Sequence, residues 1–365
     1  MKRPPTIHEL AADLGVSSTT VWRAFQEKAR IGETTRRRIL ARAKALGYAP
    51  SQVAQNLSQG RTRTLGVIVP MAGHPVFSTL VEKIEEAAFR RGYNVILCNT
   101  YLSMERETEY ARMLLSRRAE GVIVVPFAER DGGAHAHRHL DALRKQGIPV
   151  VLLEQGLASA PFPSVVADNF GAAYAMTRHL IDLGHRRIAF AFHPVHDWDP
   201  VGTERLEGFR KAMAGARLTS KARILLNTVE LEEGGRVWAY RPEPIRACFQ
   251  GLGSTRPTAL FAAMDSLAIQ AMETIQSLGL DVPNDIAVAG FDNIEFSQFT
   301  RPPLTTIAQP LEEMALRAVD LLFERIDQRR DAPPPRRRPE KAERLPCRLV
   351  LRASCGSPFP SAAQP

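Results

Sequence analysis

The sequence contains few residues of the kinds that build covalent or metal frameworks, and it has no long apolar run. Its 365 residues include only four cysteines, Cys98, Cys248, Cys347 and Cys355, without C-x-x-C spacing. This argues against a disulfide framework or a cysteine-based zinc site, so we expect free thiols. No apolar run approaches the ~18 residues of a membrane-spanning helix, and the N-terminus lacks the apolar region of a signal peptide. We therefore expect a soluble, cytoplasmic protein.

Charge is unevenly distributed along the chain, although the formal net charge is +9. Residues 1–63 carry 12 Lys and Arg against 4 Asp and Glu, and residues 329–352 carry 9 against 3, whereas residues 64–328 carry 27 against 32. A basic N-terminal segment is typical of a polyanion binder, because Lys and Arg displace counterions from phosphates. A solvated charged surface without a partner explains the charge equally well.

The first 50 residues show the pattern of three short helices. Thr6 and Glu9 have the spacing of a capping box, apolar residues then recur every three to four positions, and Gly15 ends the first helix. Ser17 is suited to cap a second helix, and a third is expected over residues 34–46. Two short helices joined by a glycine-containing turn form a helix-turn-helix.

The second of these helices has a polar face suited to a DNA major groove. Small hydroxyl side chains allow close approach to base edges, and an arginine can donate two hydrogen bonds to guanine. Trp22 fits such a face poorly, and packing over the third helix is an equally good interpretation of it. The candidate DNA-binding residues in this region are Thr6, Ser17, Ser18, Thr19, Thr20, Trp22 and Arg23.

From residue 64 onward, short apolar runs alternate with amphipathic stretches. The runs that indicate strands are LGVIVP, YNVILCN, GVIVVP, PVVLLE, RIAFAF, ARILLN, TALFAA and IAVAGF. This alternation predicts parallel sheets with helices on both faces, and eight strands fit two lobes better than one. Ligands of open α/β sheets bind at the carboxyl ends of strands, so we expect a ligand cleft between the lobes.

Five residues near the ends of these strands are candidate ligand contacts. His74 and Phe77 follow the first strand, Arg205 lies near the start of the helix after RIAFAF, and Asp292 directly follows IAVAGF. A carboxylate and a guanidinium that converge from different loops can grip the vicinal hydroxyls of a sugar. Asp265 is a further candidate, or alternatively the N-cap of its own helix.

Six motifs occur in order along about nine tenths of the chain. They are TIHELAADLGVSSTTVWRAF with its continuation to Pro70, LGHRRIAF, RLEGFRKAM, RPTALFAAMDSLAIQAM, LDVPNDIAVAGFDN and PPLTTIAQP. Together they resemble the lactose/galactose repressor (LacI/GalR) family of bacterial transcription regulators. The resemblance implies an α/β fold, with a small all-α helix-turn-helix head and a two-lobed, periplasmic-binding-protein-like core of parallel sheets.

The resemblance also implies roles for individual residues in the head. Ser18, Thr19 and Arg23 match positions that read bases. Trp22 stands where the family has a serine that touches a phosphate, and Gln26 replaces its usual asparagine. One phosphate contact is therefore in question, and we expect an operator that differs from the commonest ones.

Two further regions gain roles from the resemblance. Residues 51–63 match the family's hinge helix, and a helix of this length is too short to be stable alone. Ala54 and Leu57 are its candidate DNA contacts, and Leu57 matches the leucine that enters and opens the minor groove. A flexible linker is the alternative. Arg205 and Asp292 match the family's most regular ligand contacts.

The expected domains follow from these assignments. They are a helix-turn-helix domain (1–50), a hinge helix and linker (51–63), a two-lobed effector-binding and dimerisation core (64–328), a basic Pro/Arg-rich disordered insertion (329–345), and a final strand with the C-terminal tail (346–365).

Enzymatic and metal-binding features are weak in the sequence. His135 and His139 have a metal-ligand spacing within HAHRH, but no third ligand lies nearby, so we interpret them as a solvated helix start and expect neither metal nor cofactor. We find no glycosidase-like acid/base pair, phosphate-cradling loop or nucleophile elbow, and therefore do not expect an enzyme.

The sequence thus predicts a DNA-binding transcriptional regulator, and specifically a repressor. We expect a homodimer, or a higher oligomer, that binds a near-palindromic double-stranded DNA operator and is modulated by a small-molecule effector, a sugar or sugar derivative. The alternative is a cytosolic sugar-binding or sugar-converting protein that does not regulate genes.

Overall fold

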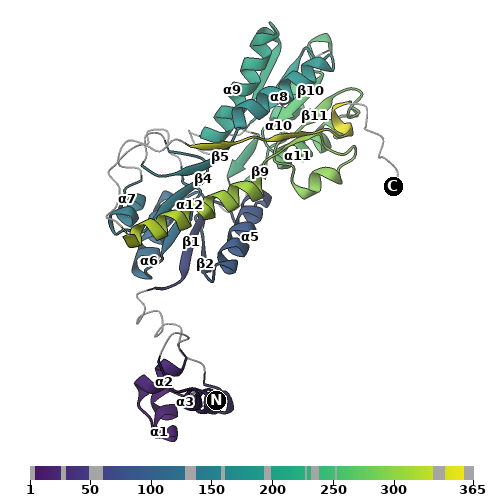
Figure 1. Cartoon of the computed structure of the whole chain (residues 1–365). Helices are drawn as coiled ribbons and strands as arrows, with labels where there is room; N and C mark the ends of the chain where they lie inside the picture. Colours follow the sequence, from purple (N-terminus) through teal and green to yellow (C-terminus); the bar gives the residue numbers. More distant parts are fainter. Residues whose placement is uncertain are drawn as a thin grey trace. The chain divides into compact units, whose positions relative to one another are not determined.

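The computed structural model of the chain divides it into two compact units, Met1–Arg63 (the head) and Thr64–Pro365 (the body) (Figure 1). Among the described residues we find no helix with the length and apolar character needed to cross a membrane. All four cysteines are free thiols, as predicted. The structure describes residues 5–25, 30–48, 61–127, 137–157, 161–192, 199–226, 228–231, 238–250, 253–331 and 342–356.

The described residues of the head form three helices, α1 (Ile7–Leu14), α2 (Ser18–Ala24) and α3 (Glu33–Leu46). Both hydrogen bonds of the predicted capping box are present: the Glu9 backbone N–H donates to Thr6 Oγ1, and the Thr6 N–H donates to Glu9 Oε2 at 2.6 Å. Gly15 ends α1 in the left-handed conformation, with φ 64°. The predicted helix starts in the head are therefore confirmed to within one residue.

A small apolar core holds the three head helices together. Leu10, Val21 and Ile39 are fully buried in it, one from each helix. Arg42 of α3 makes a two-pronged ion pair with Asp13 of α1, at 2.6 and 3.0 Å. Arg42 lowers the pKa of the Asp13 carboxyl, chiefly through the hydrogen bond. Part of the basic charge in the head therefore fixes α1 against α3.

The N-terminal lobe of the body is built on a six-stranded parallel sheet with the strand order β13-β5-β4-β3-β1-β2. Its strands are β1 (Thr64–Val69), β2 (Asn94–Asn99), β3 (Gly121–Val124), β4 (Val150–Glu154), β5 (Ser164–Ala167) and β13 (Glu343–Leu345). Its helices are α5 (Pro75–Arg90), α6 (Met104–Ser116), α7 (Arg138–Lys145) and α12 (Leu311–Asp331).

The C-terminal lobe is built on a four-stranded parallel sheet with the order β11-β10-β6-β7. Its strands are β6 (Ile188–Ala191), β7 (Ala222–Leu225), β10 (Ala259–Ala262) and β11 (Ala287–Ala289). Its helices are α8 (Asn169–Asp182), α9 (Pro200–Gly215), α10 (Glu243–Phe249) and α11 (Asp265–Ser277). Two small antiparallel pairs add β8 (Val229–Leu231) with β9 (Trp238–Tyr240), and β12 (Thr306–Ala308) with β14 (Arg348–Val350). Short 3₁₀ turns span Thr219–Lys221, Gly253–Thr255, Glu295–Gln298 and Ala353–Cys355.

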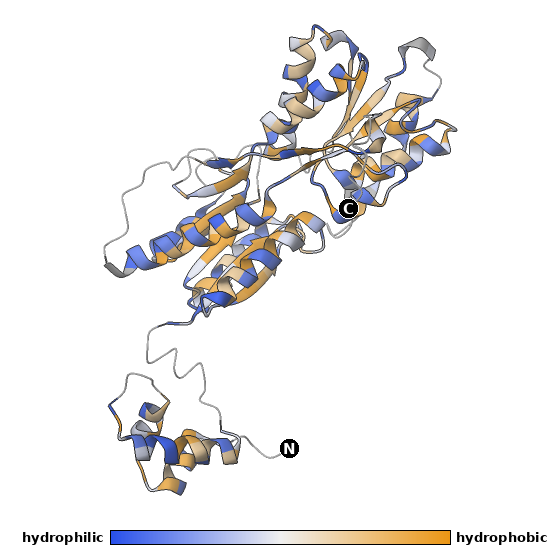
Figure 2. Cartoon of the chain, turned by 45° about the vertical axis from the view of Figure 1, so that its right-hand side comes forward, coloured by the Kyte–Doolittle hydropathy of each residue, from blue (hydrophilic) through white to orange (hydrophobic). Residues whose placement is uncertain are grey.

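Apolar clusters cover both faces of each sheet, which is why the strand sequences are almost continuously hydrophobic. Figure 2 shows this as apolar strands flanked by helices that carry one apolar and one polar side. All eight predicted strands are present, seven of them slightly shorter than predicted. The sequence analysis missed β5, β8, β9, β12 and β13, which are runs of only three or four residues.

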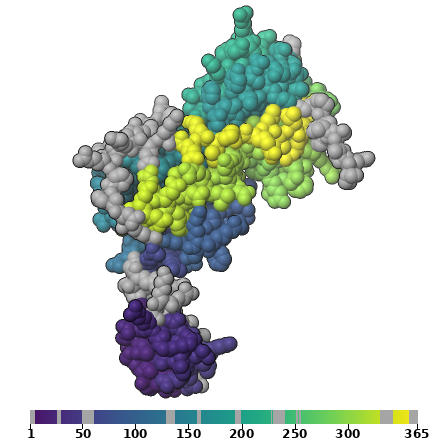
Figure 3. Space-filling view, in the orientation of Figure 1, coloured from purple at the N-terminus to yellow at the C-terminus, as the bar shows by residue number. Residues whose placement is uncertain are grey.

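The chain passes between the lobes three times: from β5 to α8, from β12 to α12, and from β13 to β14. In Figure 3 the described residues after 341, drawn in yellow, lie between α12 and the α8 and α9 region, in line with strands that belong to both lobes.

These crossings correct the predicted insertion at residues 329–345. Residues 329–331 complete α12, and β13 pairs with β5 at the edge of the sheet, so both ends of the segment belong to the folded core. A run of Pro and Arg obscured these two elements in the sequence. Residues 332–341 lie outside the described part of the chain.

Candidate ligand cleft and nucleic-acid interface

A cavity of about 130 Å³ lies between the two lobes of the body. Its walls come from segments that follow the carboxyl ends of β1, β2, β3, β4, β6, β10 and β11, and from the beginnings of α5 and α9. Parallel strands of both lobes therefore direct their carboxyl ends toward one cleft, as the sequence predicted. Four predicted residues line it: His74, Phe77, Arg205 and Asp292.

Arg205 is the centre of a buried polar network on the C-terminal wall. Its Nε donates to Asn169 Oδ1 at 2.9 Å, and its Nη1 donates to the Ala263 carbonyl at 2.6 Å. The same Nη1 lies 3.4 Å from Asp292 Oδ1, and the guanidinium carbon lies 3.7 Å from the centre of the Phe291 ring. Four contacts from three separate segments thus fix one guanidinium, whose side chain is only 6% exposed.

Asp292 occupies a strained backbone position beside this guanidinium. Its φ of 116° is rare for a residue with a Cβ, and such strain is concentrated at functional sites. Gln309 Nε2 donates to Asp292 Oδ1 at 2.8 Å. Burial raises the pKa of Asp292, while Arg205 and, more weakly, the Gln309 hydrogen bond oppose that rise. The cleft therefore holds a carboxylate, an amide and a guanidinium in one fixed arrangement.

Asp265 does not line the cleft, in contrast to its predicted role as a ligand contact. Its side chain is buried behind Asp292, where Oδ2 accepts from the Ile294 N–H at 3.0 Å and Oδ1 accepts from Thr306 Oγ1 at 2.5 Å. It is the first residue of α11, whose N-cap is Met264. Asp265 thus positions the loop that carries Asp292, and its nearness to the strand end in sequence was misleading.

The N-terminal wall is mostly apolar. His74 precedes α5, and its ring centre lies 5.5 Å from that of Phe77. The pKa of His74 is lowered, first by burial and then by the Arg205 charge, although Asp292 acts in the opposite direction. Phe127 adds a second aromatic side chain from the segment after β3. This wall offers rings and few charges.

In the head, the face of α2 carries the predicted recognition residues. Ser17 caps α2, with its Oγ accepting from the Thr20 N–H, and Thr19 and Arg23 are exposed. Ser18 Oγ lies 3.0 Å from His8 Nδ1 of α1, which links the two helices at that face. The exposed side chains are available to contact nucleic acid.

Trp22 is half-buried and is absent from the residues that form or contact the head core. The packing of Trp22 over α3 stays a prediction. Gln26 and the hinge residues Ala54 and Leu57 lie outside the described residues.

Comparison with known proteins assigns the chain to a family. Residues 6–51 match the family described as "Bacterial regulatory proteins, lacI family", and residues 177–355 match the periplasmic binding protein-like domain. The chain is 34% identical, over 325 residues, to the HTH-type transcriptional repressor PurR of Photobacterium profundum, covering 88% of this chain and 92% of the relative. The chain belongs to the lacI family. It is accordingly a transcriptional regulator with a DNA-binding head, and not an enzyme.

Solved structures resemble this lacI-family regulator over most of its length. The lac repressor dimer bound to operator and the anti-inducer ONPF matches 97% of this chain and 99% of its own, with a TM-score of 0.78 and 24% identity, which supports the shared fold. A LacI family transcriptional regulator from Enterococcus faecium with bound ribose matches 80% and 98%, with a TM-score of 0.63 and 28% identity.

Sequence reasoning missed five polar residues that line the cleft of this regulator, Thr100, Glu154, Gln155, Asp199 and Gln309. Glu154 ends β4 with a φ of 69°, and burial raises its pKa to about 7. Asp199 caps α9, and burial raises its pKa as well. The signal for Glu154 was visible, since a carboxylate ended the apolar run PVVLLE. Gln309 stood in the quoted motif PPLTTIAQP without being recognised as a ligand candidate.

The interpretation of His135 and His139 as a solvated helix start is also wrong for the one of these two histidines that the structure describes. His139 is 7% exposed and lies against Glu107 of α6. The third group that the sequence seemed to lack comes from a segment some thirty residues earlier. His135 lies outside the described residues.

Proposed function

We propose that this regulator represses transcription in the cytoplasm by binding a near-palindromic operator as a homodimer, and that a sugar or sugar derivative in the cleft changes its operator affinity. The observation that carries the effector proposal is the buried network of Arg205, Asp292 and Gln309 at one wall of a cavity whose other wall is aromatic.

Several features favour a sugar. A guanidinium next to a carboxylate places hydrogen-bond donors beside acceptors. Two adjacent hydroxyls of one sugar can therefore hydrogen-bond to both groups. Gln309 Oε1 is buried without a hydrogen-bond partner among the residues that the structure describes, which leaves an acceptor for a ligand hydroxyl. Phe77 and Phe127 offer apolar surface to the C–H face of a sugar ring. The similar regulator from Enterococcus faecium is described with bound ribose, which is a sugar.

A dimer is favoured by the small size of the recognition face. One α2 helix reaches few base pairs, whereas two heads related by a two-fold axis read two half-sites. Arg23 is exposed on this face and suits a guanine contact, while Thr6, Ser18 and Thr19 are suited to close approach. The lac repressor, which shares the fold, was described as a dimer bound to operator.

We further propose that residues 51–63 form the hinge, in which Ala54 and Leu57 contact the minor groove. A segment of this length is unstable as an isolated helix, so its order depends on DNA and on the partner subunit. Leu57→Ala should weaken specific binding and reduce DNA bending, but leave salt-dependent binding to random DNA. Wild-type bending by this variant would show that the segment is only a tether.

The effector proposal is tested by ligand-dependent thermal stability. Purified protein is heated with a panel of sugars, polyols, nucleobases and nucleosides, because a ligand that binds the folded state raises the melting temperature. We expect a sugar to stabilise the wild type and Asp292→Asn to abolish the shift. Glu295→Gln, which makes the same change at an exposed position of the same loop, should leave it intact. Stabilisation by nucleobases and by no sugar would overturn the ligand class.

The DNA proposal is tested separately, by selecting bound duplexes from a random pool. We expect the enriched sequences to be near-palindromic and the complex to contain two chains, as measured by light scattering. A single asymmetric half-site bound by one chain would contradict the homodimer.

A further inference from the structure

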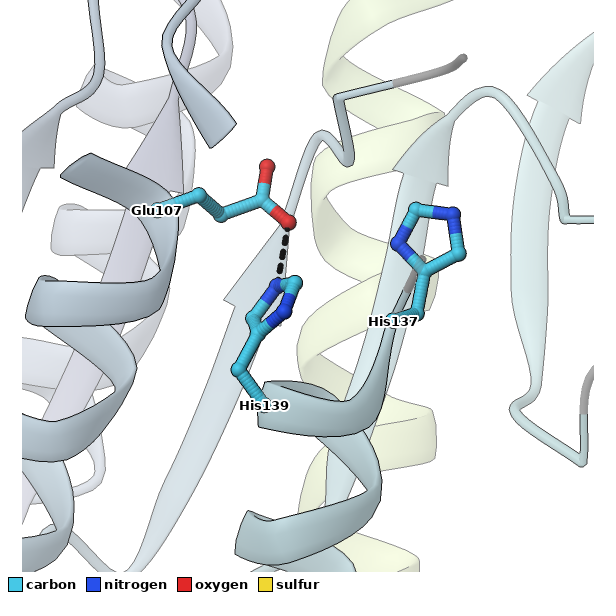
Figure 4. A group of neighbouring side chains, drawn as sticks. All are labelled: Glu107, His137 and His139. Atoms are coloured by element: carbon cyan, nitrogen blue, oxygen red, sulfur yellow. Dashed lines mark hydrogen bonds and ion pairs between the residues drawn. The ribbon is translucent and has the colours of Figure 1, made fainter. Parts of the chain in front are cut away.

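A second group of chemically active side chains lies in the N-terminal lobe, outside the cleft. Glu107 comes from α6, His137 is the residue that precedes α7, and His139 belongs to the first turn of α7 (Figure 4). Each residue offers one ligand atom, and these three atoms all lie within 4.8 Å of one another. Two packed helices thus bring a carboxylate and two imidazoles together.

Two members of the group are buried, the third is half-buried, and their own contacts satisfy only part of their hydrogen-bonding capacity. Glu107 is fully buried, and its Oε1 lies 2.6 Å from His139 Nε2. His137 Nδ1 is also buried and has no hydrogen-bond partner among the described residues. Buried polar atoms in native proteins are almost always paired, so an unpaired ring nitrogen beside a carboxylate–imidazole pair requires an explanation.

We propose that Glu107, His137 and His139 form a binding site for a divalent transition-metal ion of the zinc type. Two imidazoles and one carboxylate are a common protein ligand set for Zn²⁺, with a fourth position left for water or another donor. Tetrahedral zinc at 2.0–2.2 Å from its ligands separates them by about 3.3 Å, so side-chain adjustments of roughly an ångström close the site. Mg²⁺ and Ca²⁺ prefer all-oxygen sites and do not suit two imidazoles.

The surroundings give the site an oriented carboxylate and a link to the cleft. Glu107 Oε2 accepts a hydrogen bond from the Phe127 backbone N–H at 2.7 Å, which is the kind of outer contact that orients a metal-binding carboxylate. Phe127 itself lines the ligand cleft. An ion held between α6 and α7 therefore fixes the position of one cleft wall, a function beyond DNA and sugar binding.

The test uses the full chain, stripped with a chelator, and the metal ions alone. We expect one equivalent of Co²⁺ to give visible absorption bands typical of nitrogen and oxygen ligands, without the near-ultraviolet band of a cobalt–thiolate bond. Zn²⁺ should displace it, and calorimetry should show one Zn²⁺ site per chain and no Mg²⁺ binding.

Three variants separate this site from adventitious binding. Glu107→Gln, His137→Gln and His139→Gln should each lose the cobalt spectrum, and Glu107→Gln keeps an oxygen that can accept from Phe127. His185→Gln removes an imidazole from the other lobe, where its Nδ1 contacts Thr258, and should bind like the wild type. Near-ultraviolet circular dichroism checks that each variant is folded.

Two results would overturn the proposal: no uptake of Co²⁺ or Zn²⁺ by the wild type, or unchanged uptake by folded Glu107→Gln and His137→Gln. Neither readout involves DNA or sugar, so failure here is distinct from failure of the proposed effector site.

Discussion

The predicted recognition face of the head and the polar wall of the cleft differ in how deeply their side chains are buried and in how far away in the sequence their partners lie. On α2, Thr19 and Arg23 are exposed, and the contacts that shape the face span at most ten residues, as between Ser17 and Thr20 or between Ser18 and His8. In the cleft, Arg205 and Asp292 are almost fully buried, and the partners of Arg205 come from Asn169 and Ala263, far away in the sequence. In the head, the residues proposed to bind DNA are thus separate from those that stabilise the fold, whereas in the cleft the residues proposed to bind the ligand also stabilise it.

The strongest test of this difference is the loss of the buried guanidinium. Arg205→Ala leaves Asp292 buried without its cation, so the free energy of unfolding of the body should fall by about 3–5 kcal/mol. Arg23→Ala removes an exposed arginine and should change stability by less than about 0.5 kcal/mol. Urea denaturation of both variants measures the contrast, and equal effects would remove it.

The next effect concerns the pH dependence of the cleft. The folded pKa of Glu154, about 7, is above the ordinary value of 4.5, so the unfolded chain releases this proton first as pH rises. Stability due to this residue is therefore fully present below pH 4.5 and is lost as pH rises toward 7, by roughly 3 kcal/mol in all.

Glu154→Gln should remove this loss, so the variant gains stability relative to wild type between pH 4.5 and pH 8. Urea denaturation at both pH values measures the gain. Glu109→Gln, at an exposed position of α6, is the control and should follow the wild type. A variant that loses stability with pH as steeply as wild type would show that Glu154 ionises normally in the folded state.

The head should respond in binding rather than in folding. Arg23→Ala should cost about 1–3 kcal/mol of operator affinity at one base position per half-site and relax specificity there. Arg37→Ala, on α3 where Arg37 pairs with Glu33, should leave base preference unchanged. Binding to a panel of single-base operator variants at fixed salt distinguishes the two, and identical profiles would contradict the assignment of the recognition face.

The smallest effect tests local stability in the head. Thr6→Ala removes the acceptor for the Glu9 N–H and should destabilise the head by about 1 kcal/mol. Thr6→Ser keeps the hydroxyl and should behave like the wild type. Thermal unfolding of the head followed by circular dichroism is the measurement; an unaltered midpoint in Thr6→Ala would mean that the capping box adds nothing.

What the sequence could predict follows the same division. The head helices, their caps and eight strands depend on local periodicity, and these predictions are confirmed. Arg205 and Asp292 reach the cleft as predicted because strand ends meet there. The orientation of Asp265 toward Thr306, and the meeting of Glu107 with His139, depend on how distant segments pack. Periodicity carries no information about such long-range encounters.

Gln309 adds a mechanical consequence to the cleft. Gln309 lies between β12, which pairs in the C-terminal lobe, and α12, which packs on the N-terminal lobe. It therefore belongs to one of the three segments in which the chain crosses from one lobe to the other. A ligand that hydrogen-bonds to Gln309 would therefore contact the connection between the lobes directly, and not a residue far from it. In the proposed function, a ligand contact and a connection between the lobes therefore share one residue, so ligand binding and the angle between the lobes would be directly coupled.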